Sequence, residues 1–155
     1  MNDQAQENSG YGDLSQEINL HSYVEKVTDQ LQEQVLATYA TVYNYVNPLR
    51  YIDANPESVE RIIHNLLDNA LRYRHPERHP FIEISSLTVG NETMLSIKDN
   101  GLGIDLETHR RNLYGMPGLL SVKSHVDSMG CYIGVESQVG AGTEFRVYFK
   151  TSVAE

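Results

Sequence analysis

Three polar side chains near the middle of the chain are spaced to project from one side of a predicted helix. At about 100° per residue, Asn65 and Asn69 lie one turn apart, and Arg72 lies nearly two turns beyond Asn65. An amide oxygen is a neutral ligand for a hard cation, and a guanidinium is a phosphate clamp of fixed charge. These residues could therefore hold a magnesium and phosphate assembly, although any surface helix also carries a solvated polar face.

A glycine-rich stretch, Asp99-Asn100-Gly101-Leu102-Gly103-Ile104, directly follows a predicted strand. Closely spaced glycines let the backbone approach a flat ligand, and a carboxylate at a strand end can accept a hydrogen bond from an exocyclic amine. A calcium loop is excluded, because glycines stand where its third and fifth ligands would be. The chain also lacks both common nucleotide signatures, so a simple turn remains the alternative interpretation of this stretch.

Two further glycine motifs follow along the chain. Gly115-Met-Pro-Gly118 precedes a predicted helix, where free N–H groups at the helix N-terminus form an anion site suited to phosphates. A plain helix start after a flexible loop is the alternative. The second motif, Gly140-Ala-Gly142-Thr143-Glu144-Phe145, is by itself also typical of a hairpin turn.

The elements that must position these motifs follow from the spacing of apolar residues. Segments whose apolar residues recur at helical spacing alternate with segments rich in β-branched and aromatic residues. Asn55-Pro56 marks the start of the second helix. We predict helices over 20–38, 55–73 and 118–129, a short helical piece over 106–112, and strands over 39–46, 49–52, 81–89, 93–98, 131–137 and 143–150. Hairpins interleaved with three helices predict an α+β fold, a two-layer α/β sandwich whose mixed, mainly antiparallel sheet is covered on one face by the helices. Residues 1–16 are polar and predict a disordered tail, which leaves 17–151 as one domain.

Composition narrows the classes of partner. Twelve Lys and Arg against 21 Asp and Glu give a net charge of −9, which argues against a nucleic-acid partner. No apolar run is long enough for a membrane span and the start lacks a signal peptide, so we expect a cytoplasmic segment without membrane contact. The single cysteine, Cys131, excludes an internal disulfide and a multi-cysteine zinc site.

The order and separation of the four motifs resemble the ATP-binding domain shared by gyrase-type topoisomerases, heat-shock chaperones, mismatch-repair proteins and sensor histidine kinases. Within that superfamily, the sequence over about 18–150 is most similar to the catalytic, ATP-binding domain of a sensor histidine kinase. Only eleven positions separate Ile104 from Gly115, which resembles the short-lid form of that domain. The resemblance implies the Bergerat fold, with ATP and Mg²⁺ as cofactors.

The resemblance also implies roles for single residues. The helix would supply Asn69 as the magnesium ligand, Asn65 lining the same site, Arg72 as a phosphate contact, and Tyr73 flanking the nucleotide. Asp99 would receive the adenine amino group, with Thr143 assisting through water. The remaining nucleotide contacts would come from Gly101, Gly103 and Ile104 around the base, and from Gly115, Gly118 and Leu119 beside the phosphates.

The implied reaction is in-line transfer of the γ-phosphoryl group to a histidine on a separate dimerisation domain, and from there to a response regulator. The branches of the superfamily that hydrolyse ATP place a glutamate where Asn65 stands, and an amide cannot act as that general base. The chain could also be the cytoplasmic part of a larger, membrane-bound sensor. Two alternatives remain open: a free-standing, anti-sigma-factor-like regulator that phosphorylates serine, and a degenerate module that has lost nucleotide binding.

Overall fold

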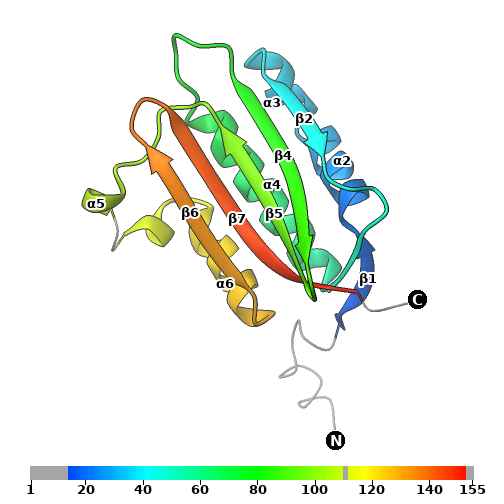
Figure 1. Cartoon of the computed structure of the whole chain (residues 1–155). Helices are drawn as coiled ribbons and strands as arrows, with labels where there is room; N and C mark the ends of the chain where they lie inside the picture. Colours follow the sequence, from blue (N-terminus) through cyan, green and yellow to red (C-terminus); the bar gives the residue numbers. More distant parts are fainter. Residues whose placement is uncertain (1–13, 110–111, 153–155) are drawn as a thin grey trace, which may run out of the picture.

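The computed structural model of the chain describes residues 14–109 and 112–152. It contains one seven-stranded sheet and a layer of helices (Figure 1). The strands are β1 (Gln16–Asn19), β2 (Thr41–Tyr45), β3 (Tyr51–Ala54), β4 (Phe81–Val89), β5 (Glu92–Asp99), β6 (Tyr132–Gln138) and β7 (Gly142–Thr151). The helices are α2 (Leu20–Gln30), α3 (Gln32–Ala37), α4 (Pro56–Arg72), α5 (Leu106–His109) and α6 (Leu119–Ser128), with a 3-10 turn, η2, at Leu113–Gly115.

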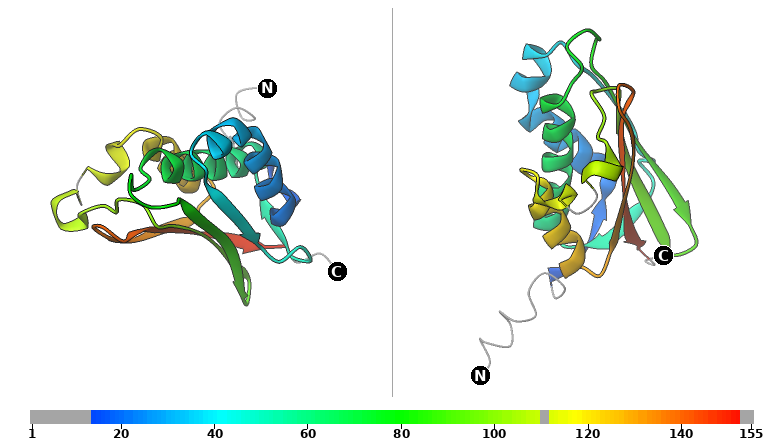
Figure 2. Two further views of the ribbon diagram at one scale, coloured as in Figure 1. Left: turned by 90° about the horizontal axis from the view of Figure 1, so that it is seen from above. Right: turned by 90° about the vertical axis from the view of Figure 1, so that its left-hand side faces the viewer.

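The sheet is mixed and mainly antiparallel, as the sequence predicts. The strand order is β1-β3-β7-β5-β4-β2, and β6 pairs with β7 off this path. Only β2 and β4 pair in parallel among the described strands; the other neighbours are antiparallel. Helices α2, α4 and α6 lie together on one face of the sheet and leave the other face open (Figure 2). The predicted fold class is therefore confirmed.

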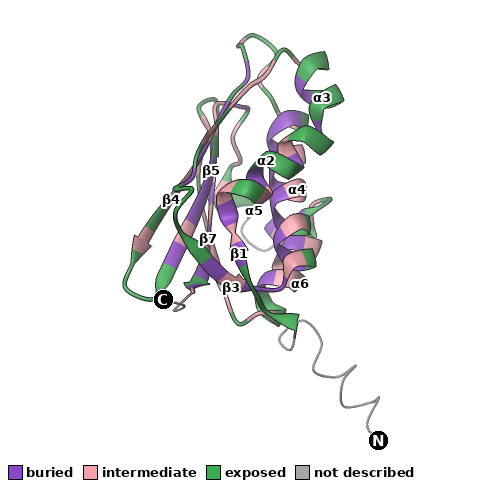
Figure 3. Cartoon of the chain, turned by 90° about the vertical axis from the view of Figure 1, so that its right-hand side faces the viewer, coloured by how far each residue is buried: buried purple, intermediate pink, exposed green. Residues whose placement is uncertain are grey.

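The hydrophobic core lies between the helices and the covered face of the sheet. Buried residues concentrate on the facing sides of the two layers, and exposed residues lie on their outer sides (Figure 3). The largest fully buried side chains come from both layers and include Ile62, Ile63 and Leu66 of α4, Leu95 of β5, and Phe145 and Phe149 of β7. Burial of this apolar surface stabilises the fold and fixes the position of α4 against β5 and β7.

Helix α4 carries the first polar motif, and its start and end follow from the sequence. The Oδ1 atom of Asn55 accepts a hydrogen bond from the Ser58 N–H at 3.0 Å, and Pro56 occupies the first turn, where a missing N–H costs nothing. At the other end, the Tyr73 N–H donates to the Asn69 carbonyl at 3.1 Å. The Tyr73 carbonyl accepts from the Leu102 N–H at 3.0 Å, so the helix ends beside the glycine-rich stretch that follows β5.

Strands β5 and β7 bring two predicted site residues to the covered face. Because side chains alternate along a strand, Asp99 lies on the same face as buried Ile97, and Thr143 on the same face as buried Phe145. Ile97 and Phe145 are direct cross-strand partners. The register therefore places Asp99 and Thr143 side by side at one end of the sheet, below the helices.

The structure differs from the predicted elements in several places. β1 is not predicted, and the helix predicted over 20–38 is two helices, because Leu31 has φ −101° and ψ 19°. The strand predicted to begin at Tyr39 begins at Thr41, since Tyr39 has a positive φ of 58°. The helical piece predicted over 106–112 ends at His109 among the described residues, and positions 110 and 111 lie outside them. Most of the predicted tail also lies outside the described residues.

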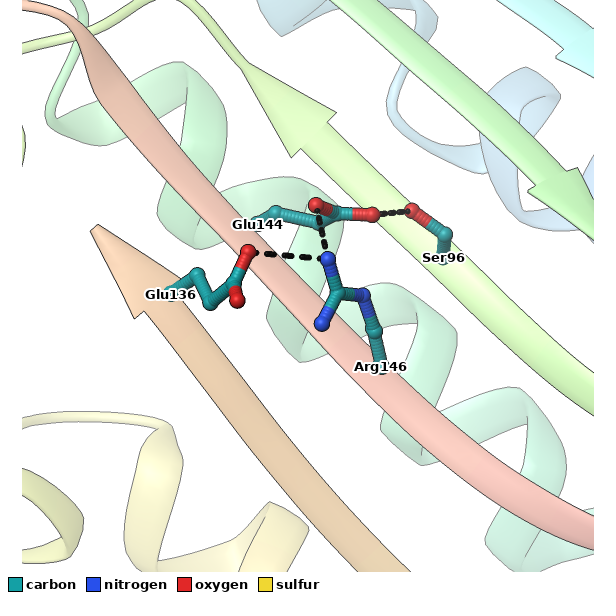
Figure 4. A network of polar contacts seen from close by, with 4 residues as sticks. All are labelled: Ser96, Glu136, Glu144 and Arg146. Atoms are coloured by element: carbon teal, nitrogen blue, oxygen red, sulfur yellow. Dashed lines mark hydrogen bonds and ion pairs between the residues drawn. The ribbon is translucent and has the colours of Figure 1, made fainter. Parts of the chain in front are cut away.

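A polar network crosses the open face of the sheet (Figure 4). Glu144 accepts a hydrogen bond from the Ser96 hydroxyl at 2.6 Å and another from the Arg146 guanidinium at 2.8 Å. Arg146 also donates to Glu136 at 2.9 Å. The network joins β5, β7 and β6 on the face opposite the helices, so it can stabilise the sheet without entering the core.

Candidate nucleotide-binding site

A cavity of about 200 Å³ lies where α4, the end of β5 and the segment before α6 meet. Its lining combines apolar surface with a few polar side chains, which is typical of a small-molecule site. The lining residues are Asn69, Tyr73, Asp99, Leu102, Gly103, Ile104, Asp105, His109, Met116 and Thr143. A larger hollow of about 600 Å³ adjoins it along β6 and β7, and Asp99 and Thr143 border both.

Asp99 is held in place by backbone donors from two segments. Its Oδ1 atom accepts hydrogen bonds from the Gly101 N–H at 2.8 Å and from the Thr143 N–H at 3.2 Å. Within the described part of the chain, no group donates to the second oxygen, Oδ2. Burial raises the pKa of Asp99, and the two backbone hydrogen bonds oppose that rise. The hydrogen bonds to Oδ1 therefore fix the orientation of the carboxylate, and Oδ2 is available as a hydrogen-bond acceptor.

Close approaches of the backbone form the wall around Asp99. A Cβ atom on Gly101 would lie 2.5 Å from the Tyr73 carbonyl oxygen, closer than real Cβ atoms approach. A Cβ on Gly103 would clash with the Gln138 carbonyl, and a Cβ on Gly142 would clash with the Asp99 carbonyl. Only glycine fits at these three positions, and their backbone approach brings the Asp99 loop against both α4 and the β6–β7 turn.

Asn69 reaches the cavity from α4 with an unsatisfied oxygen. The residue is 6% exposed, and its Oδ1 atom is buried without a hydrogen-bond partner. A buried polar atom without a partner costs free energy, so its presence at a cavity requires an explanation. A bound cation would satisfy it, because amide oxygens are suitable ligands for Mg²⁺. His64 Nδ1 is the other buried atom without a partner among the described residues, and it does not line this cavity.

Several predicted site residues do not line the cavity. Asn65 lies one turn before Asn69 and donates from Nδ2 to the Gly118 carbonyl at 3.3 Å, so it joins α4 to the start of α6. Arg72 is exposed and pairs with Asp68 at 2.9 Å on the same helix. Gly115 is exposed, and Leu119 is fully buried in the core. The structure therefore brings Asn69, Tyr73, Asp99, Gly103, Ile104 and Thr143 together, with Gly101 behind them.

Sequence reasoning missed Ser137, which connects two predicted site residues. Its hydroxyl lies 2.8 Å from the Thr143 hydroxyl, accepts from the Ile104 N–H at 2.7 Å, and donates to the Gly142 carbonyl at 3.0 Å. Ser137 lies just ahead of the motif that begins at Gly140, on the preceding strand. No local pattern marks it, because Gly142 and Thr143 meet it only when β6 pairs with β7, and Ile104 comes from the loop after β5.

Asp105 and His109 also line the cavity, although neither is among the nucleotide contacts that the resemblance implies. Asp105 begins α5, where its carboxylate accepts from the Thr108 hydroxyl at 2.9 Å and from the Thr108 N–H at 3.3 Å. These bonds lower the pKa of Asp105. Aspartate is a favoured residue at a helix start, and this signal could have located the turn but not its position at the cavity.

The comparisons with known proteins agree with this geometry. Residues 54–153 match the family described as histidine kinase-, DNA gyrase B-, and HSP90-like ATPase. The chain belongs to this family. Within the family it is of the histidine kinase type: it is 31% identical over 116 residues to the sensor protein RprX of Bacteroides fragilis, and 32% identical over 120 residues to the sensor histidine kinase CitA of Klebsiella pneumoniae.

These alignments cover 65% and 66% of the chain but 22% of each relative, so the chain spans about a fifth of their length. The fold of the chain is also that of a solved histidine kinase, AdeS of Acinetobacter baumannii. The two superpose with a TM-score of 0.77 at 22% identity, over 88% of this chain and 66% of the AdeS chain. No helix in the described part of the domain is both long enough and apolar enough to cross a membrane.

Proposed function

We propose that this domain binds ATP with Mg²⁺ and transfers the γ-phosphoryl group to a histidine on a separate domain of a sensor histidine kinase. One observation carries the proposal: Asn69, with its unpaired amide oxygen, and Asp99, with a free carboxylate oxygen, line the same cavity. One side chain is suited to a cation and the other to an exocyclic amine. ATP with bound Mg²⁺ presents both partners in one ligand, with the exocyclic amine on the adenine at one end and the cation on the phosphates at the other.

The base end of the cavity is built for a flat ring with an amino group. Asp99 Oδ2 accepts the amine, and the Thr143 N–H holds the other oxygen, Oδ1, of the same carboxylate. Gly103 and Ile104 supply backbone and apolar contact to the ring, and Tyr73 closes the side formed by α4. A purine with a carbonyl at the same position would place two acceptors against each other, so the site favours adenine over guanine.

The phosphate end depends on Asn69 and the start of α6. The described residues hold no cluster of three or more His, Cys, Asp or Glu side chains around a possible metal position. Mg²⁺ bound by Asn69 would therefore complete its shell with phosphate oxygens and water, as Mg²⁺ commonly does in nucleotide sites. Arg72 is exposed in its pair with Asp68, so solvent screens the pair and Arg72 can leave it at little cost to contact a phosphate.

Asn65 favours transfer to a partner over hydrolysis. Its amide has no basic lone pair, so it cannot take a proton from a water molecule aligned with the γ-phosphate. The domain then contributes orientation and charge neutralisation, and the partner supplies the nucleophile. We propose that this partner is the phosphoacceptor histidine of the same or a sister chain, that a response regulator receives the group next, and that the domain works in the cytoplasm, where ATP is available.

Titration calorimetry with ATP, with and without Mg²⁺, tests the binding step. We expect saturable binding that Mg²⁺ strengthens, and no heat at millimolar ATP would contradict the proposal. The transfer step is tested by adding γ-labelled ATP and a purified phosphoacceptor hairpin from a sensor kinase. The expected label is stable in alkali and lost in acid, as phosphohistidine is. Acid-stable label on serine, or release of inorganic phosphate without acceptor, would contradict the proposed reaction.

A further inference from the structure

Arg78 lies in the connection between α4 and β4, and its side chain joins two loops. Its Nη1 atom donates to the Asn100 carbonyl at 2.7 Å, and its Nη2 atom donates to the Gly140 carbonyl. Asn100 belongs to the loop after β5, and Gly140 belongs to the β6–β7 turn. One half-buried guanidinium therefore ties together three segments that are distant in sequence.

These two loops form one wall of the candidate site. Asn100 directly follows Asp99, and Gly140 lies three positions before Thr143. The same loops also meet through a backbone hydrogen bond from the Gly140 N–H to the Leu102 carbonyl at 2.7 Å, and the Leu102 N–H donates to the Tyr73 carbonyl at the end of α4 at 3.0 Å. Arg78 lies behind this contact and is not one of the residues that line the cavity.

The charge of Arg78 has no carboxylate partner within the described residues, because the ion pairs found there involve other cations. Its positive charge acts on two backbone carbonyls, and hydrogen bonds from a charged donor are stronger than those between neutral groups. A guanidinium presents several donors in a rigid plane, so it can hold two acceptors at a fixed separation. A lysine carries its donors on one flexible ammonium and cannot fix that separation in the same way.

We infer that Arg78 is a positioning residue for base recognition: it holds the loop of Asp99 and the turn before Thr143 in the register that aims Asp99 Oδ2 into the cavity. The inference rests on the proposed function for the identity of the base. Asp99 depends on this register, because one of its orienting donors, Gly101, belongs to the first loop, and the other, Thr143, lies at the start of β7, after the second. Without the clamp, the loops move apart and the carboxylate loses its direction.

The test compares Arg78→Met and Arg78→Lys with Arg50→Met, a matched control at an exposed arginine in the turn before β3. ATP and GTP affinities are measured by calorimetric competition. We expect Arg78→Met to weaken ATP binding about tenfold and to lower the preference for ATP over GTP, with Arg78→Lys intermediate and Arg50→Met unchanged. A role in overall stability alone would weaken both nucleotides equally and leave the preference unchanged, which would overturn the inference.

Amide hydrogen exchange on the nucleotide-free domain gives a second readout. In Arg78→Met, the Gly101 and Thr143 amides should exchange about tenfold faster, while amides in the β4–β5 ladder keep their protection. Unchanged exchange at these two amides would overturn the inference. If the wild-type domain binds no ATP, the proposed function fails and the assignment to base recognition fails with it. The exchange data still decide in that case whether Arg78 holds the two loops together.

Discussion

The backbone at Gly142 lies directly against the carbonyl of Asp99. A Cβ atom on Gly142 would clash with that carbonyl oxygen and would come within 2.9 Å of the Asn100 Cα atom. Gly142 also has a φ of 134°, which side chains other than glycine rarely adopt. The close approach lets the neighbouring Thr143 N–H reach Asp99 Oδ1, so the geometry of the acceptor depends on the absence of one methyl group.

Gly142→Ala should therefore damage both folding and binding. We expect a loss of about 1–3 kcal/mol in the free energy of unfolding, from strain and from displacement of the Asp99 loop, together with weaker ATP binding. Urea denaturation and calorimetry measure the two effects. Gly134→Ala is the matched control, because a Cβ on Gly134 meets nothing within 4 Å. Equal behaviour of the two variants would show that the loop tolerates the methyl group.

Asp99→Asn should separate nucleotide recognition from folding. The amide keeps an oxygen for the Gly101 and Thr143 donors but presents an amino group to adenine where an acceptor is needed, so two donors oppose each other. We expect ATP affinity to fall by roughly ten- to a hundredfold, the range for a lost hydrogen bond to a charged group. His79→Ala is the control, because His79 is exposed and contacts the Thr41 hydroxyl. Similar losses in both variants would place the base elsewhere.

The same variant has a predictable dependence of stability on pH. Burial raises the folded-state pKa of Asp99, so the folded state holds this proton more tightly than the unfolded state does. Stability therefore falls as pH rises from the unfolded pKa, near 3.9, through the folded pKa. Asp99→Asn lacks this cost, so we expect its stability relative to wild type to increase over that range and then level off. A constant difference between pH 3 and pH 7 would contradict the shift.

The contribution of Glu144 to stability should depend on pH in the opposite direction. Burial alone would raise the pKa of Glu144, but the hydrogen bonds from Ser96 and Arg146, together with nearby positive charges, lower it. Its contribution is present above the unfolded pKa and is lost as pH falls through the folded pKa. Glu144→Gln should cost about 1 kcal/mol at pH 7 and much less near pH 3 in urea denaturation, with ATP affinity unchanged.

Glu83→Gln is the control for this experiment. Glu83 lies on the neighbouring strand β4 and forms no ion pair within the described residues. We expect a change in the free energy of unfolding below about 0.5 kcal/mol at both pH values. If Glu144→Gln changed the free energy of unfolding by no more than this, solvent would screen the Ser96–Glu144–Arg146 network on the open face.

The sequence predicts well those parts of the fold that local rules determine. The start of α4 follows from Asn55 and Pro56, and β4 has its predicted bounds, because strong alternation and a glycine turn mark it. β1 was missed because four mostly polar residues become a strand only by pairing with β3. The break at Leu31 was missed because the apolar spacing continues across it.

The residues of the candidate site also divide into those that a local motif marks and those whose partners come together only in the folded chain. Asn69, Asp99 and the glycines of the Asp99 loop belong to local motifs, so sequence alone identified them. Ser137 and Arg78 act through partners more than thirty positions away or on other elements, and no local pattern marks them. Arg72 and Leu119 share motifs with site residues, but their side chains are directed to Asp68 and to the core. A motif identifies the segment, and packing decides which of its side chains face the cavity.

Asn69→Ala should remove the effect of Mg²⁺ on ATP binding while it preserves recognition of the base. The unpaired Oδ1 atom is suited to a cation, so its loss should bring ATP affinity in Mg²⁺ down to the affinity measured with a chelator present. Adenosine binding should change by less than about twofold, because we propose that the base binds at Asp99. Asn65→Ala is the matched control one turn earlier, where Nδ2 already donates to Gly118. If Asn69→Ala kept the full Mg²⁺ effect and Asn65→Ala lost it, the metal would be bound through Asn65.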